Sequence, residues 1–411
     1  MSLWAGRVEG QLDPAVWEFL RVDDAELLPY DCEATAEHAQ RLHAAGLLTD
    51  SELAEVEGRL AEIANDPGAY LESDEDVHTS IERQLGEVGR KIHAGRSRND
   101  QVAAAFRLYV LDACAEAREE IDALALVVIS FAEAEADTVM PGYTHLQRGQ
   151  PVTLGHHLLA WVEMLDRDRA RFAAAAEAAA ASPLGAGALA GSTLDLPAPA
   201  GQMRNSIDAV ADRDFALDYL YAAAVLFTHL SRIGEEIVIW STAEFGFVRL
   251  PEGAATGSSM MPQKLNPDVA ELVRGKAGTM IGRLTGLLAT VKGLPLAYDR
   301  DLQEDKAPVF ATRGDVRVGL QALLVLLSGL DVDRERLAGA ASDPLLLATD
   351  AAEALVRDGM AFRDAHEQVA ATVRDGSFEP PPEFAHRPAP GPGGVREAIA
   401  DAKSRYSGDN L

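Results

Sequence analysis

The stretch from Asp100 to Asp137, DQVAAAFRLYVLDACAEAREEIDALALVVISFAEAEAD, decides the expected fold class. It lies within a longer segment, Arg96 to Met140, that contains neither glycine nor proline. Its apolar residues recur at helical spacing, and a continuous helix of this length would be roughly 60 Å long at about 1.5 Å per residue. A helix so long, with apolar residues on more than one face, is typical of a helical bundle.

Further long helices are expected at about 155–181, at about 208–245, in a segment that starts after Pro267, and at about 305–330. The first 95 residues predict shorter helices, and the region after about residue 330 predicts a helix pair followed by the proline-rich stretch EPPPEFAHRPAPGPGG. Strand signals are few. We therefore expect an all-α protein of three helical regions: an N-terminal domain at 1–95, a central bundle of very long helices with the catalytic loops at 96–335, and a small C-terminal domain at 336–411.

Composition and charge narrow the function classes. The chain has 411 residues, 47% of them hydrophobic, which is ample for a large core. Its formal net charge is −28, from 65 acidic against 37 basic residues, and such a field repels nucleic acid and anionic membranes. The same field would repel an anionic substrate unless the binding site concentrates positive charge of its own. Nucleic acid and membranes are therefore not expected as partners.

The cysteines and the chain start indicate the compartment. Two cysteines, Cys32 and Cys114, form no disulfide framework, and no Cys/His spacing suggests zinc. The opening MSLWAGRVEG lacks the basic and apolar runs of a secretory signal, and no stretch approaches the ~18 apolar residues that span a bilayer. We expect a cytoplasmic protein without a metal site.

Clusters of polar residues lie between the expected helices. The clusters are SDEDVHTSIE (73–82), KIHAGRSRNDQ (91–101), MPGYTHLQRGQP (140–151), TGSSMMPQKLNPD (256–268) and GLPLAYDRDLQEDK (293–306). Each places hydroxyls, amides, His or Arg near a helix N-terminus, where free N–H groups and the dipole favour anions. One cluster alone would be an ordinary helix cap or turn. Five clusters that converge at bundle ends would form a site for a polyanionic molecule.

The loop 256–268 carries the most specific chemistry. Ser258 and Lys264 are six residues apart, so the loop is not a Ser-x-x-Lys arrangement, and it matches neither a phosphate-binding loop nor a Gly-x-Ser-x-Gly elbow. What remains is a serine on a glycine-led loop with an ammonium group nearby. A serine alkoxide that is stabilised by charge and by N–H donors would remove a weakly acidic proton from a carbon beside a carboxylate.

These motifs resemble a known family. GSSMMPQKLNPD resembles the GSSxMPxKxNP loop of the fumarase/aspartase superfamily, whose members are all-helical homotetrameric lyases. Within that superfamily, HAGRSRNDQV, MPGYTHLQRGQP, PLGAGALAGS, KGLPLAYDRDLQEDK and LLLATDAAEALVRDGMAFRDAHE resemble the argininosuccinate lyase family, in the same order and over almost the entire chain. Delta-crystallins of the eye lens share these motifs.

The resemblance implies a reaction and an assembly. The implied activity is the reversible β-elimination of argininosuccinate to arginine and fumarate, the last step of arginine synthesis, without a metal or organic cofactor. The implied assembly is a homotetramer in which three subunits contribute to each site. Two alternatives stay open: another fumarate-releasing lyase of the superfamily, such as one acting on adenylosuccinate or another N-linked succinate, and a catalytically silent crystallin-like protein. The motif GRSRNDQ favours argininosuccinate as the substrate over these alternatives.

Residue roles also follow from the resemblance. Ser258 matches the family's loop serine, the implied base, while Lys264 and Asn266 would stabilise charge that develops on the substrate carboxylate. His145 matches a histidine implied as acid or base, and Glu271 matches the carboxylate paired with it. Further site positions, implied to bind substrate, are His78, Ser97, Arg98, Asn99, Thr144, Arg213, Tyr298, Gln303 and Lys306.

The chain departs from the family pattern at several positions. The opening run is WAGRV, at 4–8, instead of Trp-Gly-Gly-Arg-Phe, and the following segment EFLRVDDAELLPYD has no counterpart of the family's substrate-contacting serine. Leu265 stands where a lysine is common, and Ala211 where a serine is frequent. The departures near the N-terminus bear on how the amino-acid end of the substrate is bound.

Overall fold

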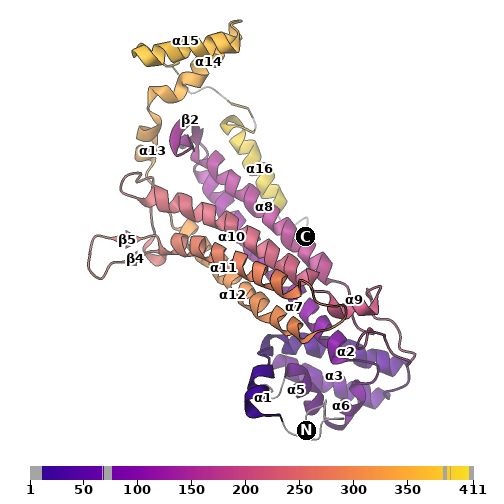
Figure 1. Cartoon of the computed structure of the whole chain (residues 1–411). Coiled ribbons are helices and arrows are strands. Elements are labelled where there is room, and N and C mark those ends of the chain that lie inside the picture. The colour runs from indigo at the N-terminus through magenta and orange to yellow at the C-terminus, as the bar shows by residue number, and fades with distance from the viewer. Residues whose placement is uncertain (1–11, 67, 69–75, 383–386, 389, 407–411) are drawn as a thin grey trace. The chain divides into compact units, whose positions relative to one another are not determined.

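The computed structural model describes residues 12–66, 68, 76–382, 387–388 and 390–406 (Figure 1). The run WAGRV lies outside these residues. The chain divides into two compact units. The first unit comprises Met1–Arg118, Ala170–Ala224 and Thr279–Val316, and the second comprises Glu119–Arg169, Val225–Gly278 and Arg317–Leu411. The division into three domains at 95/96 and 335/336 stays a prediction.

The expected short N-terminal helices are present in the first unit. They are α1 (Pro14–Leu20), α2 (Leu28–Ala44), α3 (Asp50–Asn65), α5 (Val77–Gln84) and α6 (Gly86–Ile92). Side-chain caps fix where they begin: Thr49 and Glu52 form a capping box at α3, and Asp76 Oδ1 accepts from the Thr79 backbone N–H at 2.7 Å at α5. Helix α2 contacts α3, α5 and α6.

The long helices are α7 (Arg98–Ala134), α8 (Leu154–Ala179), α10 (Asp214–Ser241), α11 (Asp268–Val291) and α12 (Lys306–Ser328). The expected single helix at about 208–245 was wrong, because α9 (Ser206–Ala211) ends before α10 begins. Asp212 adopts an extended conformation, with φ −61° and ψ 131°, and its Oδ1 accepts from the Asp214 backbone N–H at 2.8 Å. This aspartate therefore ends one helix and caps the next.

Aromatic contacts join the long helices in the first unit. Phe106 of α7 meets Phe215 of α10 and Phe310 of α12 edge-on, with ring centroids 5.3 and 6.4 Å apart. Phe172 of α8 meets Tyr219 of α10 at 5.7 Å. Such edge-to-face pairs stabilise a core beyond the area that they bury. Four of the long helices thus share one core in this unit.

In the second unit, a tryptophan pair and a glycine contact join the long helices. Trp161 of α8 stacks on Trp240 of α10 with ring centroids 5.7 Å apart. Gly234 of α10 lies against the backbone of Ala270 in α11, where an added Cβ would sit 2.5 Å from the carbonyl oxygen. The two helix backbones therefore approach closely only because position 234 has no side chain.

Short strands position the loops, although strand signals in the sequence are few. β1 (Val139–Thr144) and β2 (Gln147–Thr153) form an antiparallel hairpin in the segment expected as a loop before α8. Its two tip residues, His145 and Leu146, both have φ of 56°, the left-handed region in which non-glycine residues are uncommon. β4 (Thr256–Gly257) pairs with β5 (Leu265–Asn266), and β3 (Val248–Arg249) pairs with β6 (Asp331–Val332).

The C-terminal part of the second unit contains α13 (Arg334–Ala341), α14 (Ala348–Arg357), α15 (Phe362–Asp375) and α16 (Val395–Tyr406). The pair α14 and α15 confirms the expected helix pair, and α16 after the proline-rich stretch was not predicted. A bundle of long helices with small C-terminal helices agrees with the expected helical fold class. No helix in the described ranges is both long and apolar enough to cross a bilayer.

The close approach at Gly234 predicts a specific sensitivity. We expect Gly234→Ala to force α10 and α11 apart and to lower the free energy of unfolding by about 1–3 kcal/mol, the usual cost of overpacking a core. Urea unfolding followed by circular dichroism measures this.

Gly58→Ala is the matched control, since Gly58 lies within α3 and an added Cβ there would meet no atom within 4 Å. Alanine is the better helix former, so this variant should gain up to about 1 kcal/mol. Equal stability of Gly234→Ala and the wild type would show that the helices are not held by this contact.

Candidate functional site

A cavity of about 560 Å³ opens in the first unit where several polar clusters meet. It is bounded by the segment after α1, the first turn of α5, the start of α7, and the 3-10 helix η3 (Arg300–Asp305) that leads into α12. The predicted site residues that line it are His78, Ser97, Arg98, Asn99, Tyr298, Gln303 and Lys306. The structure therefore brings together side chains that are up to 228 positions apart in the chain (306 − 78).

A buried carboxylate anchors the cationic side of this cavity. Asp305 is fully buried and forms an ion pair with Arg213, while its Oδ1 accepts from Lys306 Nζ at 2.7 Å. Arg213 also donates to the backbone oxygen of Asp212 at 2.7 Å. Arg213 is not among the lining residues, so it lies behind Lys306, and a direct contact with substrate at Arg213 stays a prediction. Lys306 reaches the cavity wall with its ammonium group held by Asp305.

His78 is held between two aspartates. Its Nδ1 lies 3.0 Å from Asp31 Oδ2, its Nε2 lies 3.8 Å from Asp24 Oδ2, and all three side chains are buried. Burial alone would raise the pKa of Asp31, but the positive charge of His78, the charge of Arg96 and the hydrogen bonds of Gln101 hold it at about 2. Asp31 thus stays ionised and fixes the histidine ring at the cavity wall.

The pKa of Asp24 is shifted in the opposite direction from that of Asp31. Burial raises the pKa of its carboxyl to about 6, and the charges of His78 and Lys306 only partly offset this effect. Its Oδ1 accepts from the Val77 backbone N–H at 3.1 Å. Sequence reasoning missed both aspartates as site residues. Asp24 precedes the 3-10 helix η1 (Ala25–Leu27) and Asp31 lies in the first turn of α2, so no regular helical spacing signalled the pair.

The start of α7 supplies the next part of the wall. Arg98 donates from Nη2 to Thr79 Oγ1 at 3.1 Å and lies 3.6 Å from an Asp76 carboxylate oxygen. Ser97 Oγ accepts from the Asn99 backbone N–H at 3.3 Å, and Asn99 Nδ2 donates to the Ala188 carbonyl at 3.1 Å. Ser97 therefore caps α7, while Asn99 lies in the first turn of this helix and contacts the segment around Ala188. Both residues line the cavity.

The segment after α1 closes the opposite side. Gln303 Nε2 donates to the carbonyl oxygen of Leu20 at 3.1 Å, and Arg300 Nη2 donates to the same oxygen at 3.0 Å. Leu20 and Val22 line the cavity with apolar side chains. In this segment, which has no serine, the polar groups facing η3 are thus backbone carbonyls.

In the second unit, β4 and β5 carry the serine loop, whose tip projects from the neighbouring helices (Figure 1). Ser258 Oγ accepts hydrogen bonds from the backbone N–H groups of Met260 at 3.2 Å and Met261 at 3.0 Å. Asn266 Nδ2 donates to Thr256 Oγ1 at 3.4 Å. The serine oxygen is therefore placed where two N–H donors would stabilise a negative charge on it.

The remaining predicted residues of this unit are exposed. Lys264 lies on the serine loop, and Glu271 lies in the first turn of α11. Thr144 ends β1 and His145 is at the hairpin tip, where both face solvent. Ser258, Lys264 and Asn266 thus share one loop, while Thr144 and His145 share another.

The raised pKa of Asp24 predicts how stability depends on pH. Because the folded-state pKa of about 6 exceeds the unfolded value near 3.8, ionised Asp24 destabilises the fold above pH 6, and this cost disappears as the pH falls toward 4. Asp24→Asn keeps an acceptor for the Val77 N–H. We expect it to raise the free energy of unfolding by roughly 2 kcal/mol at pH 8, with the gain shrinking between pH 6 and 4.

Urea unfolding at several pH values measures this gain. Asp23→Asn is the control, because Asp23 is the exposed neighbour. A less stable Asp24→Asn at pH 8 would mean that the fold requires the ionised carboxylate.

Comparisons with known proteins identify relatives of this chain. A family model described as "Lyase" matches residues 21–282, and one described as "Argininosuccinate lyase C-terminal" matches residues 345–378. Argininosuccinate lyase from Frankia casuarinae is 50% identical over 392 residues, covering 91% of this chain and 84% of that protein.

Two further relatives extend the comparison. Argininosuccinate lyase from Halorhodospira halophila is 46% identical over 391 residues, again covering 91% of this chain and 84% of that protein. The crystal structure of EDDS lyase in complex with formate superposes with a TM-score of 0.78 at 26% identity, covering 98% of this chain and 91% of that one. The chain therefore belongs to the argininosuccinate lyase family of the fumarate lyase superfamily.

Proposed function

We propose that this protein cleaves argininosuccinate reversibly to arginine and fumarate by β-elimination. A base removes a proton from the succinate carbon beside a carboxylate, and the negative charge spreads into that carboxylate. The bond from the neighbouring carbon to the guanidino nitrogen then breaks, and a general acid protonates the nitrogen. Family membership and the charge pattern of the first-unit cavity support this reaction.

The cavity's mixed charge is the observation that carries the proposal. Argininosuccinate bears several carboxylates together with an ammonium and a guanidinium group. Arg98 and Lys306 offer cations for the carboxylates, while Asp24 and Asp76 lie in the same lining and offer anions for the cationic end. A purely anionic substrate would bring further negative charge next to these two carboxylates. The substrate class that fits this lining is therefore an N-linked succinate with a cationic end.

Ser258 is the proposed base. A serine hydroxyl is a poor base until its alkoxide is stabilised, and here Oγ already accepts from two backbone N–H groups. The ammonium of Lys264 on the same loop would add positive charge, and Asn266 would donate to the charged carboxylate. His145, paired with Glu271, would act at the leaving nitrogen. Its position at an exposed hairpin tip lets it enter a site built from several chains.

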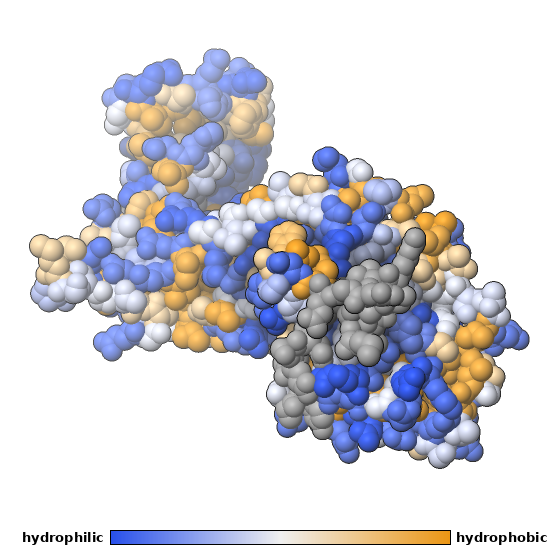
Figure 2. Space-filling view, turned by 60° about the horizontal axis from the view of Figure 1, so that its bottom comes forward, coloured by the Kyte–Doolittle hydropathy of each residue, from blue (hydrophilic) through white to orange (hydrophobic). Residues whose placement is uncertain are grey.

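We further propose a homotetramer in which each site draws on three subunits. Helix α11 presents Gly275, Gly278, Gly282 and Gly286 at helical spacing, and an added Cβ at each would meet no atom within 4 Å. Exposed Leu272 on the same helix, and hydrophobic residues scattered over the surface in Figure 2, add apolar area. Helices with small residues pack closely on one another, so we assign this face of α11 to contacts with other copies of the chain.

Light scattering of the purified protein tests this assembly. We expect the mass of a tetramer, and the mass of a monomer would contradict the proposal.

The apolar wall at Leu20 and Val22 bears on the choice of substrate. The expected serine is absent from this segment, so the amino-acid end of the substrate would meet the backbone carbonyls and the carboxylate of Asp24. An N-linked succinate with a different amine therefore remains the second candidate. Comparing fumarate release from several succinates separates the two.

The central catalytic prediction concerns Ser258. We expect Ser258→Ala to keep the fold and assembly of the wild type but to lower turnover of argininosuccinate by ~100-fold or more, the scale of losing a positioned base. Ultraviolet absorbance of fumarate measures the rate, and circular dichroism checks the fold.

Ser259→Ala is the matched control, since Ser259 is the exposed neighbour on the same loop. Turnover near the wild-type value in Ser258→Ala would refute the assignment of this serine. A similar loss in both variants would point to disruption of the loop rather than to removal of a base.

A further inference from the structure

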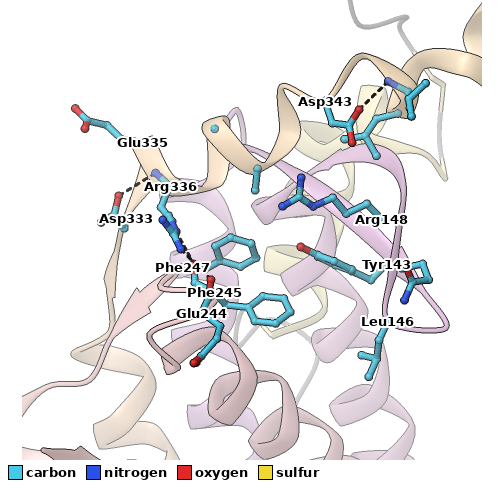
Figure 3. Close-up of a pocket in the computed structure, with 15 residues that line it drawn as sticks. Tyr143, Leu146, Arg148, Glu244, Phe245, Phe247, Asp333, Glu335, Arg336 and Asp343 are labelled. Atoms are coloured by element: carbon cyan, nitrogen blue, oxygen red, sulfur yellow. Dashed lines mark hydrogen bonds between the residues drawn. The ribbon is translucent and has the colours of Figure 1, made fainter. Parts of the chain in front are cut away.

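A second cavity lies in the second unit, beside the hairpin that carries His145 (Figure 3). Its volume is about 1140 Å³, and it is bounded by the hairpin, the turn after α10, helix α13 and the 3-10 helix η4 (Pro344–Leu347). None of the residues assigned to the elimination reaction lines it. Pockets that hold small ligands commonly measure ~300–1,000 Å³, so this cavity has room for one.

Aromatic rings form one side of the cavity. Tyr143 and Phe245 lie with ring centroids 5.9 Å apart, and Phe245 meets Phe247 edge-on at 5.4 Å. Figure 3 shows the Tyr143 side chain on the hairpin side and the two phenylalanines facing it. Leu146, at the strained hairpin tip, is 70% exposed and also lines the cavity. The half-buried rings of Tyr143 and Phe245, with the exposed Leu146, give the cavity an apolar surface that a flat ligand would cover.

One cation in the cavity is available to a ligand. Arg148 is the cross-strand partner of Tyr143, and Figure 3 shows its side chain extending over the cavity above that ring. Among the described residues, no hydrogen bond or ion pair reaches its guanidinium group. Arg336, in contrast, is engaged, because it donates to the carbonyl oxygens of Phe245 at 2.9 Å and Glu244 at 2.8 Å. A free guanidinium beside a ring favours a carboxylate, which it can bind through two hydrogen bonds.

The carboxylates around the cavity limit the charge of the ligand. Asp333 accepts from the Arg336 backbone N–H and pairs with Arg249, and Asp343 accepts from the Leu345 backbone N–H. Glu244 and Glu335 also line the cavity and add negative charge. A nucleotide or another polyanion would be repelled here, whereas a single carboxylate on Arg148 would not.

We propose that this cavity binds a small organic monocarboxylate with a flat, apolar body, its carboxylate on Arg148 and its flat face on Tyr143 and Phe245. Because the hairpin tip supplies both Leu146 and His145, the bound ligand would restrain the segment that carries the histidine. None of the residues that line this cavity is assigned to the elimination reaction, so binding there can be measured independently of turnover.

Calorimetric titration of the full chain with benzoate tests the proposal. We expect binding near millimolar affinity, weakened by about 10-fold or more in Arg148→Ala, as when a charge-assisted hydrogen bond is lost. Arg148→Lys keeps the charge but not the paired geometry, so it should weaken binding less than Arg148→Ala does. Cyclohexanecarboxylate, which is not flat, and inorganic phosphate, which has no apolar body, should both bind more weakly than benzoate.

The controls separate this cavity from other sites. Arg90→Ala removes an exposed arginine far along the chain and should leave benzoate binding unchanged. Thermal unfolding checks that each variant is folded. If Arg148→Ala does not fold, the comparison of Arg148→Lys with the wild type tests the proposal. Undiminished binding in both Arg148 variants would overturn the proposal. The absence of detectable benzoate binding to the wild type would also overturn it. Loss of binding in Arg98→Ala, with binding kept in the Arg148 variants, would overturn it too, because it would place the anion in the first-unit cavity.

Discussion

The candidate site in the first unit depends on one buried carboxylate. Asp305 is enclosed by protein and is shared by Arg213 and Lys306. An unpaired cation in this position would lose several kcal/mol of hydration, so each of the three charges needs the others. Because Arg213 begins the segment that leads into α10 and Lys306 begins α12, the same interaction fixes the starts of two long helices. The ammonium group of Lys306 consequently reaches the cavity in one defined position.

Local charge explains how a chain with a net charge of −28 can act on a molecule with several carboxylates. The two cations that line the first-unit cavity each have an acidic partner: Asp305 for Lys306 and Asp76 for Arg98. These partners hold the cations in place without removing them from the cavity wall. The remaining carboxylate, Asp24, has a raised pKa because it is buried. The cavity lining therefore carries mixed charge rather than strong positive charge.

The sequence predicted much of the helical framework, and seven of the residues that it predicted to bind substrate line the first-unit cavity. The long apolar periodicity around Asp100–Asp137 fixes α7, since a glycine-free and proline-free run of that length has no competing structure. It did not predict the break at Asp212, because a capping aspartate inside a helical pattern resembles a surface charge until its backbone is seen. The hairpin tip at His145 was also missed, since neither tip residue is the glycine or asparagine that such turns usually require. Asp24 escaped notice because its importance comes from burial, which no local pattern reports.

The measurement that tests the central claim most directly is fumarate release by the purified protein, followed by ultraviolet absorbance, from argininosuccinate, adenylosuccinate, malate and aspartate supplied separately. The mixed charge of the first-unit cavity and the intact serine loop together predict release from argininosuccinate alone, with the departures near the N-terminus tolerated. Release from adenylosuccinate or aspartate, with none from argininosuccinate in a folded sample, would contradict this account. That result would show that the segment around Leu20 and Val22 has redirected the site to a different N-linked succinate.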